Sequence, residues 1–409
     1  MCPVDLTIFL VDGTVPLKVD GAAGRQPSAQ TPTNGQIGLS RSAWARGGMS
    51  SSIMTKAGGA RSWTGPVIDC DVHANIPSLD ALFPYQDPIW VEFARERGWK
   101  GPVLGVTYPP EAETTARPEW KPAKGLPATD ISMLREYILD PWKVETAILN
   151  CYYYVEGLRH PDWAAAIARS MNDWVIEHWL EKDSRLRASI SIPARDPVAA
   201  AREIDRVGGH PGFVQVLLPV RTNGLYGQRA FWPIFEAITR HDLVAGIHWG
   251  GQSEGAPSPT GYASYYAEEM VAETQVFASQ LTSLIIEGLF QKFPTLRVSM
   301  LEGGFTWVPT WAWNLNKKWK GLRREIPWVN RPPTEIIRDH IRFSTTPADM
   351  GPPEQMRRIL DWLGTEDILM FASDYPHLHH DDIDALLALM SDTMRANVMA
   401  ETARRWYRL

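Results

Sequence analysis

The stretch VIDCDVH, from Val67 to His73, is a short apolar run that ends in residues of the kind that bind divalent metal ions. Three later runs have the same form, and they are Val244–His248, Val298–Glu302 and Ile368–Asp374. The parallel strands of a (β/α)8 barrel bring their C-terminal tips to one mouth, where the active site is built. The four runs therefore predict such a barrel and a metal-dependent enzyme.

The rest of the chain supports an alternation of strands and helices. The predicted strands are Val67–His73, Glu145–Asn150, Arg187–Pro193, Gly212–Pro219, Leu243–Trp249, Arg297–Gly303, Ile341–Thr346 and Ile368–Tyr375. Helical patterns cover Pro161–Lys182, Pro197–Val207, Trp232–His241, Thr274–Phe293, Pro353–Leu363 and Asp382–Tyr407. Alternation of this kind indicates an α/β fold with a parallel sheet, and eight strands favour closure into a TIM barrel. An open doubly wound sheet is the alternative, but no G-x-G-x-x-G motif follows the first strand.

Two insertions interrupt the alternation. Residues 74–143 follow the first strand, and residues 250–272 follow the fifth strand. Both come after the C-terminal end of a strand, so we expect them at the mouth of the barrel, where loops form the substrate pocket.

The chain divides into two predicted regions. Residues 1–62 are rich in Gly, Ser, Ala, Thr and Pro without sustained periodicity, which predicts a flexible, disordered N-terminal extension. Residues 63–409 form the predicted barrel domain. Part of the extension could also reflect a mis-assigned translation start, because Met49 and Met54 lie just before the first strand.

Composition limits the classes of partner and compartment. The 41 basic and 47 acidic residues give a net charge of −6, so we expect no binding to nucleic acid or to an anionic membrane. The three cysteines form no C-x-x-C pair, which favours a cytoplasmic protein. No apolar stretch approaches the ~20 residues that span a bilayer, and the first residues lack the basic region of a signal peptide.

The four predicted strand tips carry a plausible ligand set for one ion. Side chains alternate along a strand, so we expect Asp69, Asp71 and His73 to share the inward face of the first strand. His248 and Asp374 end strands whose other inward positions are small or apolar. Two carboxylates and two imidazoles suit Zn2+, with Mn2+ as the alternative, and the carboxylates balance the charge of the ion.

The motifs at these positions resemble the amidohydrolase superfamily. They are I-D-x-D-x-H ending at His73, His248 followed by Trp249-Gly250-Gly251, E-G-G-F-T-W-V-P from Glu302, and F-A-S-D-Y-P-H ending at His377. They are most similar to the amidohydrolase-related decarboxylases, typified by aminocarboxymuconate semialdehyde decarboxylase and the resorcylate decarboxylases. The resemblance covers about residues 66–409, and it implies a single metal ion held by Asp71, His73, His248 and Asp374.

Two positions depart from the pattern of that family. Asp71 stands where the family has the first His of H-x-H, and Glu302 stands on the sixth strand where the best-known decarboxylases have a His. The fourth strand, Gly212–Pro219, carries no Lys that could bridge two metal ions, so one ion is expected. The sequence is compatible with two roles for Glu302, either as a metal ligand or as the group that transfers a proton.

The resemblance favours non-oxidative decarboxylation of a small aromatic or unsaturated carboxylic acid. Glu302 is the predicted acid that protonates the carbon losing CO2, with Asp374 and His377 as further catalytic candidates. The alternative is hydrolysis of an ester, lactone or amide by metal-bound water, with Asp374 or Glu302 as the base. A non-catalytic barrel that only binds a ligand is a third class.

The remaining predictions concern neighbouring residues and partners. The run His379, His380, Asp381 and Asp382 is interpreted as a helix-capping segment, so only His377 is kept as a site residue. A small-molecule substrate is the expected partner, and barrels of the resembled branch suggest a homodimer.

Overall fold

The computed structural model describes residues 63–101, 116–152, 155–250, 258, 261, 263–379 and 381–409. The described residues all belong to one compact unit, Ser51–Leu409. The predicted extension, residues 1–62, lies outside the described residues, as do parts of both insertions and His380.

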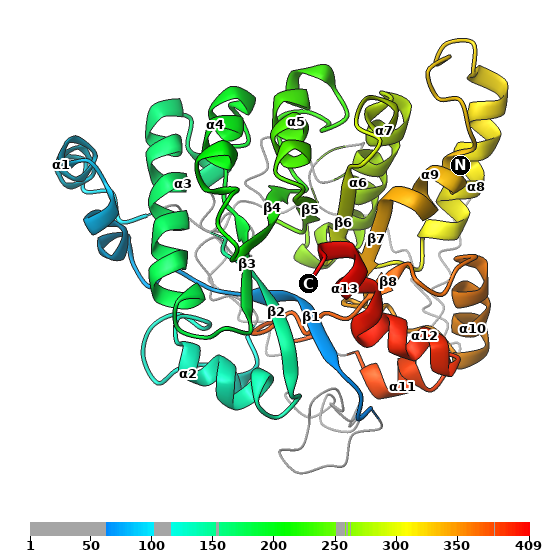
Figure 1. The fold of residues 1–409 in the computed structure, drawn as a ribbon, viewed down its shortest axis with the longest axis horizontal. Helices are drawn as coiled ribbons and strands as arrows, with labels where there is room; N and C mark the ends of the chain where they lie inside the picture. Colours follow the sequence, from blue (N-terminus) through cyan, green and yellow to red (C-terminus); the bar gives the residue numbers. More distant parts are fainter. Residues whose placement is uncertain are drawn as a thin grey trace, which may run out of the picture. The chain divides into compact units, whose positions relative to one another are not determined.

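Eight parallel strands form one sheet in the order of the sequence, β1 to β8 (Figure 1). Their bounds are β1 Val67–His73, β2 Val144–Asn150, β3 Leu186–Ile190, β4 Phe213–Pro219, β5 Val244–His248, β6 Arg297–Leu301, β7 Ile341–Ser344 and β8 Leu369–Met370. The apolar runs predicted all eight, because strands covered on both faces read as near-continuous hydrophobic segments. The predicted (β/α)8 barrel is confirmed.

The sheet closes because the segment after β8 returns to β1. Cys70 N donates to Phe371 O at 3.0 Å, and His73 N donates to Tyr375 O at 2.8 Å. These bonds place residues 371–375 beside the end of β1, so the predicted last strand, Ile368–Tyr375, is extended backbone although only two of its residues belong to β8.

A β-bulge in β1 changes the predicted alternation of side chains. Asp69 pairs with Ala147 and Val72 pairs with Leu149, so three steps along β1 match two steps along β2. A bulge of this kind re-aims the side chains on either side of it. His73 then pairs with Asn150.

The prediction that Asp69 shares an inward face with Asp71 and His73 is therefore wrong. Ile68 and Cys70 instead contribute to the interior apolar cluster that contains Val244 and Met370. The Asp69 carboxylate accepts hydrogen bonds from the backbone N–H groups of Asp71 and Ser373 at 3.2 and 3.0 Å, which ties the end of β1 to the segment after β8.

Helices surround the strands (Figure 1). They are α1 Pro88–Glu96, α2 Ile131–Leu134, α3 Pro161–Val175, α4 Pro197–Val207, α5 Trp232–Arg240, α6 Tyr266–Ile286, α7 Leu289–Lys292, α8 Val308–Leu322, α9 Pro333–His340, α10 Pro353–Trp362, α11 Ile383–Leu387, α12 Asp392–Ala396 and α13 Thr402–Tyr407. Short 3-10 or π-helical turns are η1 Leu79–Tyr85, η2 Pro118–Trp120, η3 Arg135–Leu139, η4 Val155–Gly157, η5 Ile176–Leu180, η6 Arg229–Phe231 and η7 Asn397–Glu401.

Local sequence explains where the helices start. Asp196 caps α4 by accepting hydrogen bonds from the N–H groups of Val198 and Ala199, and Pro197 occupies the first turn, where it costs no hydrogen bond. Between β6 and β7 the chain forms α8 and α9, which were not among the predicted helices.

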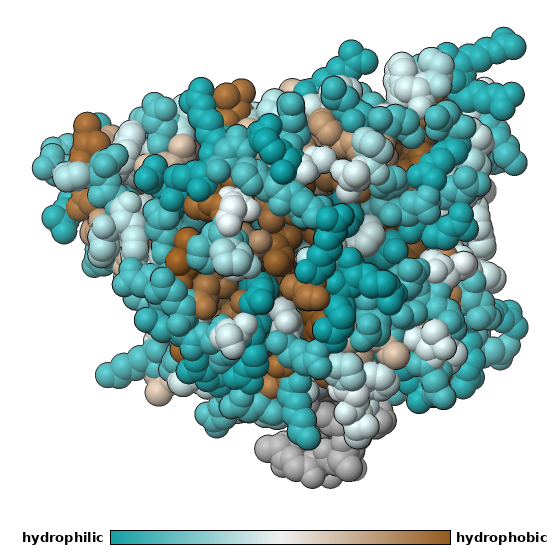
Figure 2. All heavy atoms as spheres, viewed as in Figure 1, coloured by the Kyte–Doolittle hydropathy of each residue, from teal (hydrophilic) through white to brown (hydrophobic). Residues whose placement is uncertain are grey.

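The main core lies between the strands and the helices, and a smaller cluster fills the barrel interior below the strand tips. The smaller cluster includes Trp406 and Tyr407 of α13, so the C-terminal helix packs into the end of the barrel opposite the tips. Figure 2 shows mainly hydrophilic side chains on the visible face, with hydrophobic ones gathered chiefly near its middle. None of the described helices is long and apolar enough to cross a membrane.

Candidate active site

Four side chains from two strands and the segment after a third strand meet at the mouth of the barrel. Asp71 and His73 come from β1, His248 ends β5, and Asp374 follows β8. One ligand atom from each lies within 4.8 Å of the others, and all four residues are buried. The structure thus brings together the four residues predicted to hold a metal ion.

Each imidazole of this group contacts a carboxylate through Nε2. His73 Nε2 lies 2.9 Å from Asp374 Oδ1, and His248 Nε2 lies 3.1 Å from Asp71 Oδ1. His248 Nδ1 lies 2.6 Å from the carbonyl oxygen of Trp249 and donates a hydrogen bond to it. That bond places the lone pair of neutral His248 on Nε2, the atom that faces the carboxylates.

Glu302 lies against this group. Its Oε2 is 3.7 Å from His248 Nε2, and Glu302 also belongs to a second group of ligand-type residues with His73, Asp374 and His377. The Glu302 side chain is buried, and Oε2 has no hydrogen-bond partner. Glu302 is therefore placed where it could either bind an ion or exchange a proton with a bound molecule.

Backbone strain coincides with two of the acidic residues. Glu302 and Asp374 adopt φ angles of 58° and 52°, in the left-handed region that non-glycine residues rarely occupy. Such conformations cost of order 1–3 kcal/mol and persist where the surroundings enforce them, commonly at functional sites. Glu302 N is held by a hydrogen bond to Ser344 Oγ at 2.9 Å.

Two histidines from the loop after Asp374 complete the group. His377 Nδ1 lies 3.1 Å from both carboxylate oxygens of Asp374, and His379 Nε2 lies 2.5 Å from Asp374 Oδ2. His379 Nε2 is also 4.0 Å from Glu302 Oε1. Reading His379 as part of a capping segment missed this contact, whereas Asp382 does cap α11 by accepting a hydrogen bond from Ala385 N.

Asn150 is another site residue that sequence reasoning missed. It ends β2, is fully buried, and donates from Nδ2 to Asp71 Oδ1 at 2.8 Å. The signal was present, because Asn150 is a polar residue at the end of an apolar run, as Asp71 and His248 are.

Burial and the close charges shift the acidities of the site. Burial raises the pKa of Glu302 to about 8, and the Asp374 carboxylate adds to the rise. Burial alone would also raise the pKa of Asp374, but its contacts with His377, His379 and His73 hold that pKa well below its usual value. One carboxylate is therefore favoured in the protonated form and the other in the ionised form.

The pKa values of His73 and His248 are also shifted in opposite directions. Burial lowers the pKa of His73. Burial acts in the same direction on His248, but Asp71 and Glu302 outweigh it and raise the pKa of His248 to about 10.

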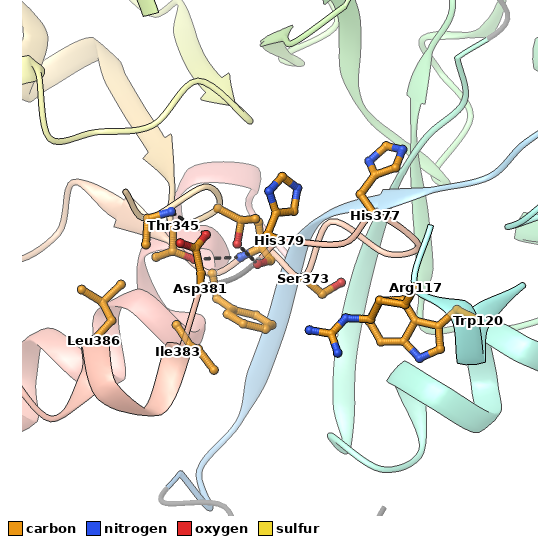
Figure 3. A pocket seen from close by; sticks show the side chains of 13 residues that line it. Arg117, Trp120, Thr345, Ser373, His377, His379, Asp381, Ile383 and Leu386 are labelled. Atoms are coloured by element: carbon orange, nitrogen blue, oxygen red, sulfur yellow. Dashed lines mark hydrogen bonds between the residues drawn. The ribbon is translucent and has the colours of Figure 1, made fainter. Parts of the chain in front are cut away.

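A pocket of about 430 Å³, including its opening to solvent, adjoins His377 and His379. Ile383 and Leu386 form one side of it, and Arg117 and Trp120 lie together on the other (Figure 3). The Arg117 guanidinium is 4.8 Å from the centre of the Trp120 ring, and the residue is 4% exposed. Arg117 comes from the insertion after β1, so that insertion does contribute to the mouth of the barrel as predicted.

Comparisons with known proteins identify the family to which this chain belongs. The family model described as amidohydrolase matches residues 68–409. Gamma-resorcylate decarboxylase of Polaromonas sp. strain JS666 is 24% identical over 266 residues, covering 60% of this chain and 77% of the relative. Gamma-resorcylate decarboxylase of Rhodococcus jostii RHA1 is 26% identical over 275 residues, covering 60% and 78%. The branch indicated by the sequence motifs is confirmed.

The fold also matches that of a solved decarboxylase. The structure of 5-carboxyvanillate decarboxylase from Novosphingobium aromaticivorans, complexed with manganese and 4-hydroxy-3-methoxy-5-nitrobenzoic acid, aligns with a TM-score of 0.63 at 18% identity. The alignment covers 88% of this chain and 100% of the other.

Proposed function

Because this chain belongs to the amidohydrolase family, we propose that it is a metal-dependent decarboxylase that removes CO2 from a small aromatic carboxylic acid. The observation that carries the proposal is the buried group of Asp71, His73, His248 and Asp374 with Glu302 against it. The decarboxylases among the relatives supply the class of reaction.

The residues fit a single divalent ion. Asp71 Oδ2 is buried without a hydrogen-bond partner, and a buried carboxylate oxygen in that state is costly unless a cation or donor meets it. Two imidazoles and two carboxylates suit Zn2+ and Mn2+. We propose Zn2+ or Mn2+, held by Asp71, His73, His248 and Asp374, with Glu302 outside the ligand set.

When bound, the ion would act as a Lewis acid toward an oxygen of the substrate and withdraw charge from it. The chain's own residues then supply the proton. The bond between the ring carbon and the carboxylate carbon breaks, CO2 leaves, and the electron pair on the ring carbon takes a proton from Glu302. Burial raises the pKa of this carboxyl to about 8, which favours the protonated form at neutral pH, and water restores the proton after each turnover.

The position of Arg117 favours the binding of an anionic substrate. Its buried guanidinium lines the pocket beside His377 and His379, where it provides a positive charge next to the candidate site. A carboxylate or phenolate of the substrate is the chemistry that such a group would recognise.

The test is an assay of the full-length protein on a panel of hydroxybenzoic acids, esters, lactones and amides. Metal-free protein is prepared with a chelator and then given Zn2+ or Mn2+. We expect about one ion per chain, and release of CO2 from at least one hydroxybenzoic acid only after the metal is returned.

If the protein hydrolyses an ester, lactone or amide and releases no CO2 from any acid, the proposed decarboxylase activity is wrong and the alternative, a metal-dependent hydrolase, takes its place. A protein that holds no ion after reconstitution would contradict the metal site itself. The homodimer and the cytoplasmic location remain predictions; light scattering of the purified protein tests the first.

A further inference from the structure

Below the candidate metal ligands, the barrel interior contains a continuous series of hydrogen-bonded polar side chains. Barrel interiors are usually filled by branched apolar residues, and polar groups buried there are costly unless each finds a partner. These side chains come from β2, β3, β4, β6 and α13, and none is more than 7% exposed. The interior hydrogen-bond chain, as we call it, consists of Asn150, Ser189, Gln215, Ser299, Trp406 and Tyr407.

Its lower end is formed by the C-terminal helix α13. Trp406 Nε1 donates to Ser299 Oγ at 3.2 Å, and the Tyr407 hydroxyl donates to Gln215 Oε1 at 2.8 Å. Ser299 Oγ and the Tyr407 oxygen are 2.9 Å apart. Since the single hydroxyl hydrogen of Tyr407 goes to Gln215, Ser299 must be the donor to Tyr407.

Its upper end reaches Asp71. Gln215 Nε2 donates to Ser189 Oγ at 2.8 Å and to Asn150 Oδ1 at 3.2 Å. Ser189 Oγ donates to the same Asn150 Oδ1 at 2.7 Å. Two donors thus fix the oxygen of the Asn150 amide, so its Nδ2 must face Asp71, to which it donates at 2.8 Å.

The direction of every bond in this chain is consistent. With Tyr407 donating to Oε1, the Gln215 amide is held with Nε2 toward Asn150, and this in turn sets the Asn150 amide. Gly246 leaves the room that Gln215 occupies, because a Cβ at that position would lie 2.3 Å from Gln215 Cδ.

The two ends of the interior hydrogen-bond chain lie at opposite ends of the barrel. Arg297, the first residue of β6, donates to the carbonyl oxygen of Trp406, whereas Asp71 and Asn150 lie at the C-terminal ends of their strands. Figure 1 shows the C-terminus of the chain among the strands.

We propose that Trp406 and Tyr407 are positioning residues for the metal ligand Asp71. They act through Gln215 on Asn150, which donates to Asp71 Oδ1 and leaves Oδ2, a buried oxygen without a hydrogen-bond partner, for the ion. The inference rests on the metal site of the proposed function. Residues that hydrogen-bond to metal ligands orient them and tune their affinity.

The experiment is a titration of metal-free, full-length protein with Mn2+, followed by electron paramagnetic resonance. Asn150→Leu removes the direct donor to Asp71, and we expect Mn2+ binding to weaken by about 10- to 100-fold. Tyr407→Phe removes only a hydroxyl at the far end, and we expect a smaller weakening of roughly 3- to 10-fold, below the range for a direct partner.

The matched control is Tyr226→Phe. Tyr226 is also fully buried, and its hydroxyl donates to the carbonyl oxygen of Pro219 at 2.9 Å, outside the interior hydrogen-bond chain. A purely structural role predicts that both Tyr→Phe variants lower the melting temperature of the metal-free protein and leave Mn2+ affinity unchanged. A positioning role predicts a weaker affinity for Tyr407→Phe alone.

Affinity for Tyr407→Phe within twofold of wild type, or an equal loss in Tyr226→Phe, would overturn the inference. If Tyr407→Phe does not fold, Ser189→Ala takes its place under the same criterion, because it removes one of the two donors to Asn150. Wild-type protein that binds neither Mn2+ nor Zn2+ would refute the metal site and this inference together, and wild type that binds Zn2+ alone is compared with the variants by calorimetric titration with Zn2+ under the same criteria. Normal binding by wild type with unchanged binding by the variants refutes the inference alone.

Discussion

Glu302 is the residue on which the proposed chemistry depends most. It combines a left-handed backbone conformation, a buried side chain and an oxygen without a hydrogen-bond partner, 3.7 Å from His248. A carboxyl group that only stabilised the fold would be expected to have both oxygens bonded. The arrangement is that of a group left available to a bound molecule.

We expect Glu302→Gln to lower kcat by ~100-fold or more, because the amide keeps the size of the side chain but cannot exchange a proton. Metal content should stay at the wild-type level of about one ion per chain. The measurement is steady-state turnover together with elemental analysis of the same preparation.

Glu203→Gln is the matched control for that variant. Glu203 and Glu302 are both 8% exposed, but Glu203 bonds to Asn172 and Arg206, away from the site. Loss of metal in Glu302→Gln would show that Glu302 is a ligand, and turnover near that of wild type would remove it from the mechanism.

At the residue scale, the rule that polar residues end buried strands found Asp71, His73, His248, Glu302 and Asp374. The same rule would have found Asn150, had it been applied to the second strand. It could not find His379, because that residue lies in a loop whose path is set by contacts distant in the sequence.

At the scale of elements, the strands were predictable because burial on both faces makes them apolar throughout. The bulge in β1 was not, since it appears only when β1 is aligned with β2. The helices α8 and α9 were missed in a segment whose several Trp and Pro residues obscure a helical period, although Pro309 and Pro333 lie in the first turns of these helices, where Pro is favoured.

The junction between η5 and β3 depends on Asp183. Its carboxylate accepts hydrogen bonds from Arg185 and from Arg135 of η3 at 2.8 and 2.9 Å, and its side chain is 9% exposed. The Arg185 and Arg135 guanidinium groups hold the pKa of Asp183 below its ordinary value. A carboxylate with a lowered pKa stabilises the fold above its unfolded pKa of about 3.9 and loses that contribution as the pH falls further.

We therefore expect Asp183→Asn to destabilise the protein by about 1–3 kcal/mol at pH 7. Melting temperatures are measured from pH 8 down to pH 3.5. The difference in melting temperature between the variant and wild type should be constant above about pH 5 and should become smaller below about pH 4. Asp205→Asn is the control, because that residue is 44% exposed and pairs with Arg240 at the surface. This account would be contradicted if the loss of melting temperature in Asp183→Asn were no larger than in Asp205→Asn, or if that loss increased at acidic pH.

At the scale of the whole molecule, the two ends of the chain have different expected roles. The C-terminal helix α13 lies in the barrel, with Tyr407 buried and Trp406 bonded to Ser299. The composition of residues 1–62 predicts no packed core, and we propose that the domain begins near residue 63.

A chain that starts at Arg61 should therefore fold, bind its metal ion and keep full turnover, because the core and site residues found in the described part of the chain all lie after residue 62. Limited proteolysis of the full chain should likewise remove residues 1–60 while activity survives. A matched truncation that ends at Arg405 should lower the melting temperature, since it removes two buried aromatic residues of the interior apolar cluster. If the chain starting at Arg61 fails to fold or loses its metal, the N-terminal region must pack on the barrel, and the proposed domain boundary is wrong.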